Sequence, residues 1–261
     1  MKIVLFCGGL GMRMREYSEA IPKPMVTIGY RPILWHIMKY YAHYGHRDFI
    51  LCLGYKADVI KNYFLQYDEC LSNDFVLSGG RNNLKLLSKD IHDWRITFVD
   101  TGLTANIGQR LKAVQNHLKG EAMFLANYTD GLCDVPLPAV IDHLRQSRKI
   151  ASFVSVRPTA SFHVIQAGAD GLVTGVEHIA RSGARMNAGY FVFRKEIFDY
   201  MEPGEELVEK PFARLIGKRQ LVSFSHDGFY ACMDTFKEKQ VLDDILASGR
   251  APWAVWNGKG H

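Results

Sequence analysis

Residues 3–25 read IVLFCGGLGMRMREYSEAIPKPM, and this stretch indicates the class of fold. It opens with four apolar residues, Ile3 to Phe6, which are typical of a buried parallel strand. Glycines at positions 8, 9 and 11 end that strand. Because glycine has no Cβ, its backbone can adopt positive φ and lie against an anion with its N–H groups directed at the oxygens. A strand that runs into such a turn predicts an α/β protein that binds phosphate.

Two cations follow the glycines, and both suit a phosphate group. Arg13 offers a planar fork of donors and Lys23 a point charge, and Pro22 and Pro24 hold Lys23 on an extended segment. The alternative for this stretch is an ordinary βα turn with two surface cations. The pattern is neither the dinucleotide-binding G-x-G-x-x-G, since Met14 stands where the last glycine would be, nor a Walker A loop.

The chain around this loop alternates strands and helices. Helix periodicity covers 31–44, with Pro32 in the first turn, and a buried strand at 48–53 precedes a second helical pattern that runs to Tyr67. This β-α-β-α opening predicts a parallel sheet with right-handed crossovers. Further strands are predicted at 95–99, 122–126 and 151–156, and further helices at 108–117 and 137–146. Residues 68–93 are read as a long excursion with one short strand.

The pattern changes after Pro158. Short alternating segments at 162–167 and 172–176 flank a hairpin turn, and a strand is predicted at 188–194. We expect an antiparallel lobe over about 158–194, then helices at 195–201 and 206–217, a strand at 221–225 and a helix at 235–247. The tail from Trp253 is expected to fray. The predicted fold is a single α/β domain over 1–261: a Rossmann-like, mostly parallel sheet flanked by helices, with a small antiparallel β lobe.

Composition narrows the class of protein. At 261 residues and 48% hydrophobic the chain can bury a full core, and its formal net charge of +5 is scattered, which favours small anionic substrates over nucleic acid. No apolar stretch reaches the roughly 18 residues of a membrane helix. Five cysteines without a C-x-x-C pair or a signal peptide indicate free thiols, a cytoplasmic protein and no structural zinc.

Two aspartates are candidate metal ligands. Asp130 follows the 122–126 strand and Asp234 follows the strand near 225, and ligands of open α/β sheets bind at the carboxyl ends of strands. A lone Asp-Gly is more often only a turn, but two carboxylates beside a phosphate loop suit Mg²⁺. No Ser/His/Asp or Cys/His set stands out, which fits phosphoryl chemistry that needs positioning and charge neutralisation instead of a general base.

Several motifs together resemble the sugar-1-phosphate nucleotidylyltransferases. They are GGLGMR (8–13) with PKPM (22–25), VDTG (99–102) with GQRLK (108–112), Asp130-Gly131, NAGYF (187–191), MDT (233–235) and APW (251–253). The stretch ILWHIMKYYAHYGHRDFILCLGYK (33–56) is most similar to the glucose-1-phosphate cytidylyltransferase branch. The resemblance covers Ile3 to Trp253 and implies a GT-A-like nucleotidyltransferase fold.

The resemblance also implies roles for residues. Arg13, Lys23 and Asp130 are the expected catalytic residues, and Asp130 and Asp234 the expected Mg²⁺ ligands. The nucleotide is expected to contact Gly8, Gly9, Gly11, Arg13, Lys23, Gly108 and Arg110. The phosphorylated acceptor is expected to contact His163, Glu177, His178, Asn187 and Tyr230.

The sequence departs from that family mainly in the acceptor half. His178 stands where the cytidylyltransferases carry a lysine that holds the sugar phosphate, so a permanent cation is replaced by a group that is mostly neutral near pH 7. His163 takes the place of a glycine, Tyr230 that of a tryptophan, and Thr129 replaces another glycine before Asp130. The nucleotide half therefore looks intact and the acceptor pocket rebuilt.

The predicted function is a Mg²⁺-dependent enzyme that joins an NTP, CTP in particular, to glucose 1-phosphate and releases pyrophosphate. One alternative is a cytidylyltransferase that acts on a non-sugar phosphorylated small molecule. Another is a non-catalytic sugar-nucleotide sensor. The expected partners are the NTP and a phosphorylated acceptor, without nucleic acid or membrane, in a homo-oligomer.

Overall fold

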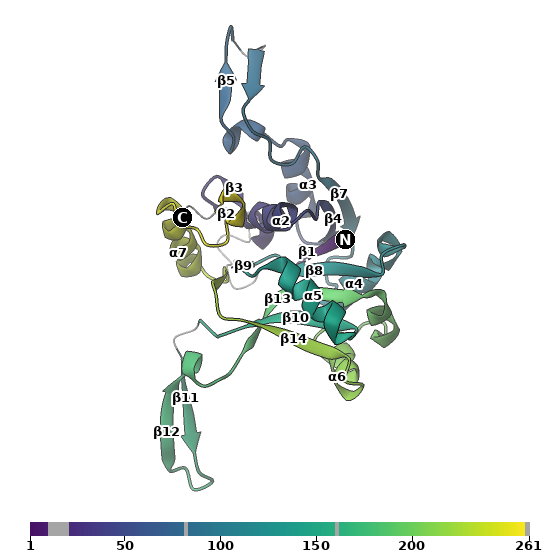
Figure 1. The fold of residues 1–261 in the computed structure, drawn as a ribbon, viewed down its shortest axis with the longest axis vertical. Coiled ribbons are helices and arrows are strands. Elements are labelled where there is room, and N and C mark those ends of the chain that lie inside the picture. The colour runs from purple at the N-terminus through teal and green to yellow at the C-terminus, as the bar shows by residue number, and fades with distance from the viewer. Residues whose placement is uncertain (10–20, 81–82, 160–161, 259–261) are drawn as a thin grey trace.

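A seven-stranded sheet in the order β14-β10-β13-β8-β1-β4-β7 forms the centre of the fold (Figure 1). The computed structural model describes residues 1–9, 21–80, 83–159 and 162–258. All strands of this sheet run parallel except β13, which is antiparallel to β8 and β10. The strands are β1 (Lys2–Phe6), β4 (Asp48–Leu53), β7 (Arg95–Asp100), β8 (Met123–Tyr128), β10 (Ala151–Val156), β13 (Met186–Arg194) and β14 (Leu221–His226).

Helices cover both faces of the sheet. Alternate residues of β1 feed two separate cores: Ile3 and Leu5 pack with α2 and α5, and Val4 and Phe6 pack with α4 and α6. The helices are α2 (Ile33–His43), α3 (Ala57–Leu65), α4 (Ile107–Ala113), α5 (Leu137–Ser147), α6 (Lys210–Gly217) and α7 (Phe236–Ala247). Short 3₁₀ turns are η2 (Lys23–Met25), η3 (Glu69–Leu71), η5 (Gln115–Leu118), η6 (Ile179–Arg181), η7 (Lys195–Tyr200) and η8 (Val255–Asn257). The predicted α/β class with a mostly parallel sheet is confirmed.

Four two-stranded sheets complete the structure. Two of them are hairpins that project from opposite ends of the molecule, the one containing β5 at the top of Figure 1 and β11–β12 at the bottom. The short strands are β2 (Thr27–Ile28) with β3 (Arg31–Pro32), β5 (Phe75–Leu77) with β6 (Leu84–Leu86), β9 (Gly131–Cys133) with β15 (Tyr230–Cys232), and β11 (His163–Ala167) with β12 (Val173–His178).

The structure differs from the sequence prediction at several places. Strand β13 lies inside the central sheet, because its run from Ala188 to Phe193 is buried throughout, so the separate antiparallel part is limited to the β11–β12 hairpin. The excursion at 68–93 holds two short strands instead of one. Pro32 is the N-cap of α2 and not part of its first turn. The tail is anchored, since Trp253 is buried and its Nε1–H donates to Nδ1 of His36 at 3.3 Å.

Among the described helices, none combines the length and apolar composition that crossing a membrane requires.

Candidate active site

The glycine turn lies at the carboxyl end of β1. Gly9 is exposed and lines a cavity of about 270 Å³, whereas Gly8 is buried. A Cβ on Gly8 would lie 2.1 Å from a guanidinium nitrogen of Arg110, while a Cβ on Gly9 would meet no atom within 4 Å. Gly8 is therefore a packing requirement, and Gly9 is the position at which backbone faces open space. Gly11 and Arg13 lie outside the described residues.

Arg110 joins the loops that follow three parallel strands. It is 2% exposed, and its guanidinium donates to Gly8 O at 2.8 Å, Leu53 O at 3.1 Å and Gly102 O at 2.9 Å, at or just beyond the ends of β1, β4 and β7. It also donates to Oγ1 of Thr101 at 2.8 Å. The two terminal nitrogens of the guanidinium thus face protein acceptors, which gives Arg110 a positioning role. Its expected phosphate contact stays a prediction.

Gly108 also has a packing role. It lies in the first turn of α4, where a capping box between Asn106 and Gln109 starts the helix. A Cβ on Gly108 would lie 2.1 Å from Glu205 O. Only glycine therefore lets α4 approach the segment at Glu205 this closely. Gly108 thus helps to place α4 and Arg110, and its expected nucleotide contact stays a prediction.

Lys23 lies between the two predicted metal ligands. Its Nζ donates to Oδ2 of Asp130 at 2.9 Å and to Oδ1 of Asp234. Burial by itself would lower the pKa of Lys23, but the two carboxylates outweigh it, and the pKa is raised. The side chains of Lys23, Asp130 and Asp234 are only 15%, 32% and 29% exposed. The amine is therefore held as a cation between two carboxylates.

A short ladder that the sequence did not predict places the aspartates side by side. Strand β9 starts directly after Asp130, β15 ends two residues before Asp234, and the two strands pair with Gly131 opposite Cys232. The N–H of Met233 donates to Asp130 O at 2.7 Å, which extends the ladder by one step. Asp234 thus comes after the strand near 225, as expected, but the short strand β15 lies between them and brings Asp234 to the site.

The helix after Asp234 fixes its backbone. Thr235 is the N-cap of α7, and Glu238 completes a capping box. Oε2 of Glu238 accepts from the N–H groups of Asp234 and Thr235, both at 2.8 Å. The start of α7 therefore holds Asp234 in place relative to Lys23.

The cavity beside this cluster is lined by both charged and apolar side chains. Lys23 and Asp130 line it together with Phe6, Gly9, Pro24, Ile107, Tyr128 and Thr129. Thr129 donates from Oγ1 to Phe6 O at 2.8 Å, which ties the loop after β8 to the end of β1. The ammonium of Lys23 and the exposed backbone of Gly9, at the carboxyl ends of β1 and β8, can bind a phosphorylated ligand, and the carboxylates can hold a divalent cation beside it.

Comparison with known proteins identifies the family. Residues 2–216 match the Nucleotidyl transferase family. The chain belongs to that family. It is 37% identical to the glucose-1-phosphate cytidylyltransferase of Salmonella typhimurium (strain LT2) over 98% of this chain and 100% of the relative. It is 34% identical to the probable glucose-1-phosphate cytidylyltransferase of Bacillus subtilis (strain 168), again over 98% and 100%. The protein is thus an enzyme of the nucleotidyltransferase class.

Solved structures share the fold of this nucleotidyl transferase. UDP-glucose pyrophosphorylase in complex with UDP-glucose superposes with a TM-score of 0.69 at 15% identity, covering 95% of this chain and 99% of the other. HddC from Yersinia pseudotuberculosis gives a TM-score of 0.66 at 18% identity, covering 94% and 99%. At these identities the likeness concerns the fold.

The acceptor residues predicted for the nucleotidyl transferase fall into three places. His163 and His178 face each other across the β11–β12 hairpin with ring centroids 5.4 Å apart, and Glu177 is the register partner of Val164 in the same hairpin. Asn187 lies at the start of β13, and its Oδ1 accepts from the N–H of Gly189 at 2.9 Å. Tyr230 is 8% exposed and packs in the core over Gly131, and its expected acceptor contact stays a prediction.

Cys232 was missed as a site residue. Its Sγ and one oxygen each of Asp130 and Asp234 lie within 4.8 Å of one another. The signal available in the sequence was its position two residues before the predicted ligand Asp234. Two carboxylates at this spacing, now bridged by the ammonium of Lys23, form a donor set that fits a divalent cation bound through oxygen.

Proposed function

We propose that this nucleotidyl transferase joins CTP to glucose 1-phosphate with Mg²⁺, giving a nucleotide sugar and pyrophosphate. A phosphate oxygen of the sugar 1-phosphate forms a bond to the α-phosphorus of CTP, and the bond between the α-phosphorus and the oxygen bridging to the β-phosphate breaks. The observation that carries this proposal is identity of 34–37% over nearly the full chain to the two cytidylyltransferases. The five cysteines, all free in the structure, fit a reducing compartment such as the cytoplasm. A homo-oligomer stays a prediction.

The residues of the chain have distinct tasks in this reaction. Asp130 and Asp234 would hold Mg²⁺, which when bound would neutralise charge on the triphosphate. Lys23, released from the two carboxylates, would bind phosphate oxygens as a point charge. Arg13 is proposed to add a bidentate contact, and Gly9 and Gly11 backbone N–H groups. The attacking oxygen is already anionic, so no side chain has to remove a proton.

The test is pyrophosphate release with four NTPs and a panel of phosphorylated acceptors. CTP with glucose 1-phosphate should give the highest kcat/KM. Turnover with a different base would overturn the CTP assignment, and turnover only with non-sugar phosphates would overturn the acceptor. Absence of pyrophosphate release with every pair would contradict the catalytic proposal as a whole, which is the outcome expected of a sensor.

A second candidate acceptor class, a non-sugar phosphate, is favoured by the two histidines. Nδ1 of His178 accepts from the N–H of Ala180 at 3.2 Å, so Nε2 of the neutral ring carries the hydrogen. Nε2–H can therefore donate a hydrogen bond to a phosphate oxygen of the substrate. Arg185 is engaged elsewhere, since it donates to Ser155 O at 2.9 Å and to Oδ1 of Asp227 at 2.6 Å. We propose that His178, paired with His163, takes the place of the lysine of the related enzymes.

Replacing His178 decides between the two acceptor classes. His178→Lys should lower the KM for glucose 1-phosphate severalfold if the pocket is a sugar pocket, because a permanent cation is restored. His163→Gly in the same background should add to that gain. If His178→Lys shows no activity with glucose 1-phosphate while wild type turns over a non-sugar phosphate, the second candidate replaces the first.

A further inference from the structure

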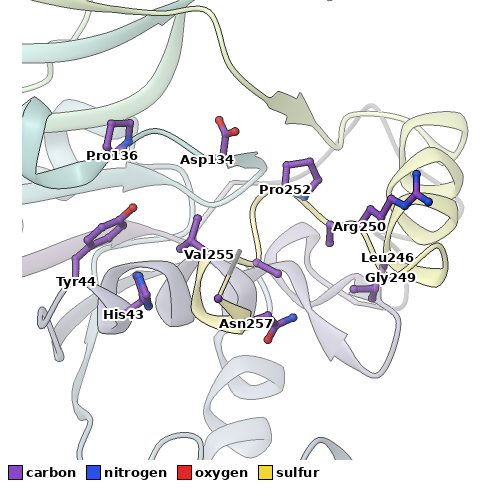
Figure 2. A pocket seen from close by; sticks show the side chains of 13 residues that line it. His43, Tyr44, Asp134, Pro136, Leu246, Gly249, Arg250, Pro252, Val255 and Asn257 are labelled. Atoms are coloured by element: carbon purple, nitrogen blue, oxygen red, sulfur yellow. The ribbon is translucent and has the colours of Figure 1, made fainter. Parts of the chain in front are cut away.

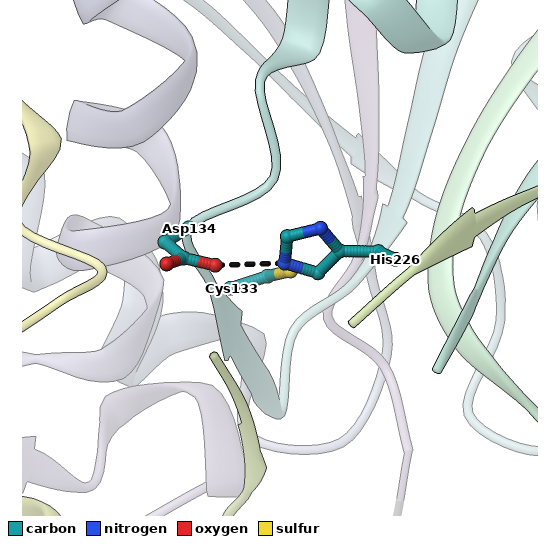
Figure 3. A group of neighbouring side chains, drawn as sticks. All are labelled: Cys133, Asp134 and His226. Atoms are coloured by element: carbon teal, nitrogen blue, oxygen red, sulfur yellow. Dashed lines mark hydrogen bonds and ion pairs between the residues drawn. The ribbon is translucent and has the colours of Figure 1, made fainter. Parts of the chain in front are cut away.

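A second set of metal-binding side chains shares no residue with the Lys23, Asp130 and Asp234 cluster. It consists of Cys133, the last residue of β9, Asp134 next to it, and His226, the last residue of β14 (Figure 3). The sulfur, a carboxylate oxygen and a ring nitrogen all lie within 4.8 Å of one another. The ligands come from segments more than ninety residues apart (|i−j| = 92 for Asp134 and His226), so cysteine spacing alone could not reveal the set.

The three groups are held in place by the surrounding backbone. Nε2 of His226 lies 2.7 Å from Oδ1 of Asp134, and that oxygen also accepts from the N–H of Phe229 at 2.8 Å. A Cβ on Gly228 would lie 2.7 Å from Oδ1 of Asp134 and equally close to Nε2 of His226. The turn at Gly228 therefore closes over the pair, and any side chain there would displace it.

Cys133 brings a sulfur to this polar pair from the core. The residue is 1% exposed, and burial raises the pKa of its thiol to about 12, while the N–H groups of Val135 and Asp134 act in the opposite direction. Binding of a metal displaces the thiol proton, so a sulfur that lies within 4.8 Å of a carboxylate oxygen and a ring nitrogen can become a thiolate ligand.

The donor types select the ion. Sulfur, imidazole nitrogen and a carboxylate oxygen suit Zn²⁺, while Mg²⁺ prefers oxygen ligands alone. Asp134 also borders a cavity of about 840 Å³ that His43, Tyr44 and Arg250 help to line (Figure 2). Water from that cavity can complete a four-coordinate site.

We propose that Cys133, Asp134 and His226 bind a zinc-type divalent ion, separate from the Mg²⁺ of the reaction. The ion connects the carboxyl end of β14 to β9, the strand that begins immediately after Asp130. Its task is to fix the β9–β15 ladder on which the two aspartates depend.

Cobalt substitution tests the site directly. The whole protein, stripped of metal and kept in excess Mg²⁺, is titrated with Co²⁺ while absorption is recorded. One equivalent should bind and give a thiolate-to-cobalt charge-transfer band, which reports a sulfur ligand. Cys133→Ser should abolish that band, whereas Cys232→Ser, which removes the sulfur of the other cluster, should retain it. A band that disappears in Cys232→Ser and persists in Cys133→Ser assigns the ion to the active site and overturns the proposal.

A histidine variant guards against a folding defect in Cys133→Ser. His226→Gln keeps a donor toward Asp134 at a partly exposed position, and circular dichroism checks its fold. Its affinity for Co²⁺, and for Zn²⁺ by competition, should fall at least about tenfold. Unchanged affinity in His226→Gln, or no charge-transfer band in the wild-type protein, rejects the site.

Discussion

At the scale of single residues, His36 links the tail to the core and is sensitive to acid. Its ring is 4% exposed, Nδ1 accepts from Nε1–H of Trp253, and Nε2–H donates to Ile28 O at 3.0 Å. Burial lowers the pKa of His36 from 6.5 to about 4. A proton on Nδ1 would face the Trp253 donor, so the folded protein disfavours the charged ring.

The sign of this shift predicts loss of stability in acid. Since the folded pKa lies below the unfolded one, the contribution is complete above about pH 6.5 and declines as the pH falls through 4, by about 3 kcal/mol in all. His36→Gln retains a donor and an acceptor but does not titrate. Urea unfolding at pH 7 and pH 4.5 should show a smaller difference for this variant than for wild type. Equal differences would contradict the prediction.

Arg110 shows how one buried side chain can organise several loops. Arg110→Lys offers three donors on a single atom and cannot span carbonyls from three loops. Each buried acceptor left unpaired costs about 1–3 kcal/mol, so we expect a loss of about 3 kcal/mol in unfolding free energy and a higher KM for the NTP. Arg145→Lys, at an exposed ion pair with Asp142, should change stability by less than about 0.5 kcal/mol. Equal stability of both variants would refute the positioning role.

At the scale of elements, the start of α7 has a positioning task. Glu238→Ala removes the acceptor for the N–H groups of Asp234 and Thr235, so we expect about 1 kcal/mol of destabilisation and a roughly tenfold lower kcat. Glu238→Gln should recover part of both, because glutamine also completes a capping box. Lys239→Ala breaks the Lys239–Asp243 pair of the same helix and should leave kcat unchanged. A stability loss without any change in kcat would mean that the box only supports the helix.

Sequence patterns predicted some elements much better than others. The mostly apolar runs of β1, β4 and β10 fix their ends to within one residue, because a buried strand is rich in apolar side chains and polar residues or glycine lie close to each of its ends. The three-residue strands β9 and β15 are too short for a period to show. Their pairing depends on chain segments that meet only after folding.

The same limit applies to site residues. Lys23, Asp130 and Asp234 were predicted from residue type and motif, and the structure brings them together. The packing of Arg110 and Tyr230 could not be predicted, because their partners, among them Gly8 and Gly131, come from distant segments whose approach no local pattern encodes.

At the scale of the whole molecule, the site is built from residues that are far apart in the sequence. Lys23 lies 107 residues from Asp130 and 211 from Asp234 along the chain, so only the complete fold assembles the three groups. We expect Asp130→Asn and Asp234→Asn each to lower kcat at least about 10²-fold, since each removes charge from the metal site at constant volume. Thermal unfolding should stay close to wild type, because partly exposed ion pairs contribute about 1 kcal/mol or less. A near-wild-type rate in either variant would exclude that residue as a ligand.

Because Lys23 lies between Asp130 and Asp234, its ammonium group is a counter-ion for both carboxylates within the protein itself. Two carboxylates this close would repel each other, and the ammonium between them neutralises part of that charge before any ligand arrives. If the proposed Mg²⁺ site is correct, loading the enzyme would be an exchange of cations: the two carboxylates would hold the ion, and the amine of Lys23 would be released to the phosphates. The local charge changes little during this exchange, so the carboxylates need no dissolved cation to stay folded side by side while the enzyme waits for substrate.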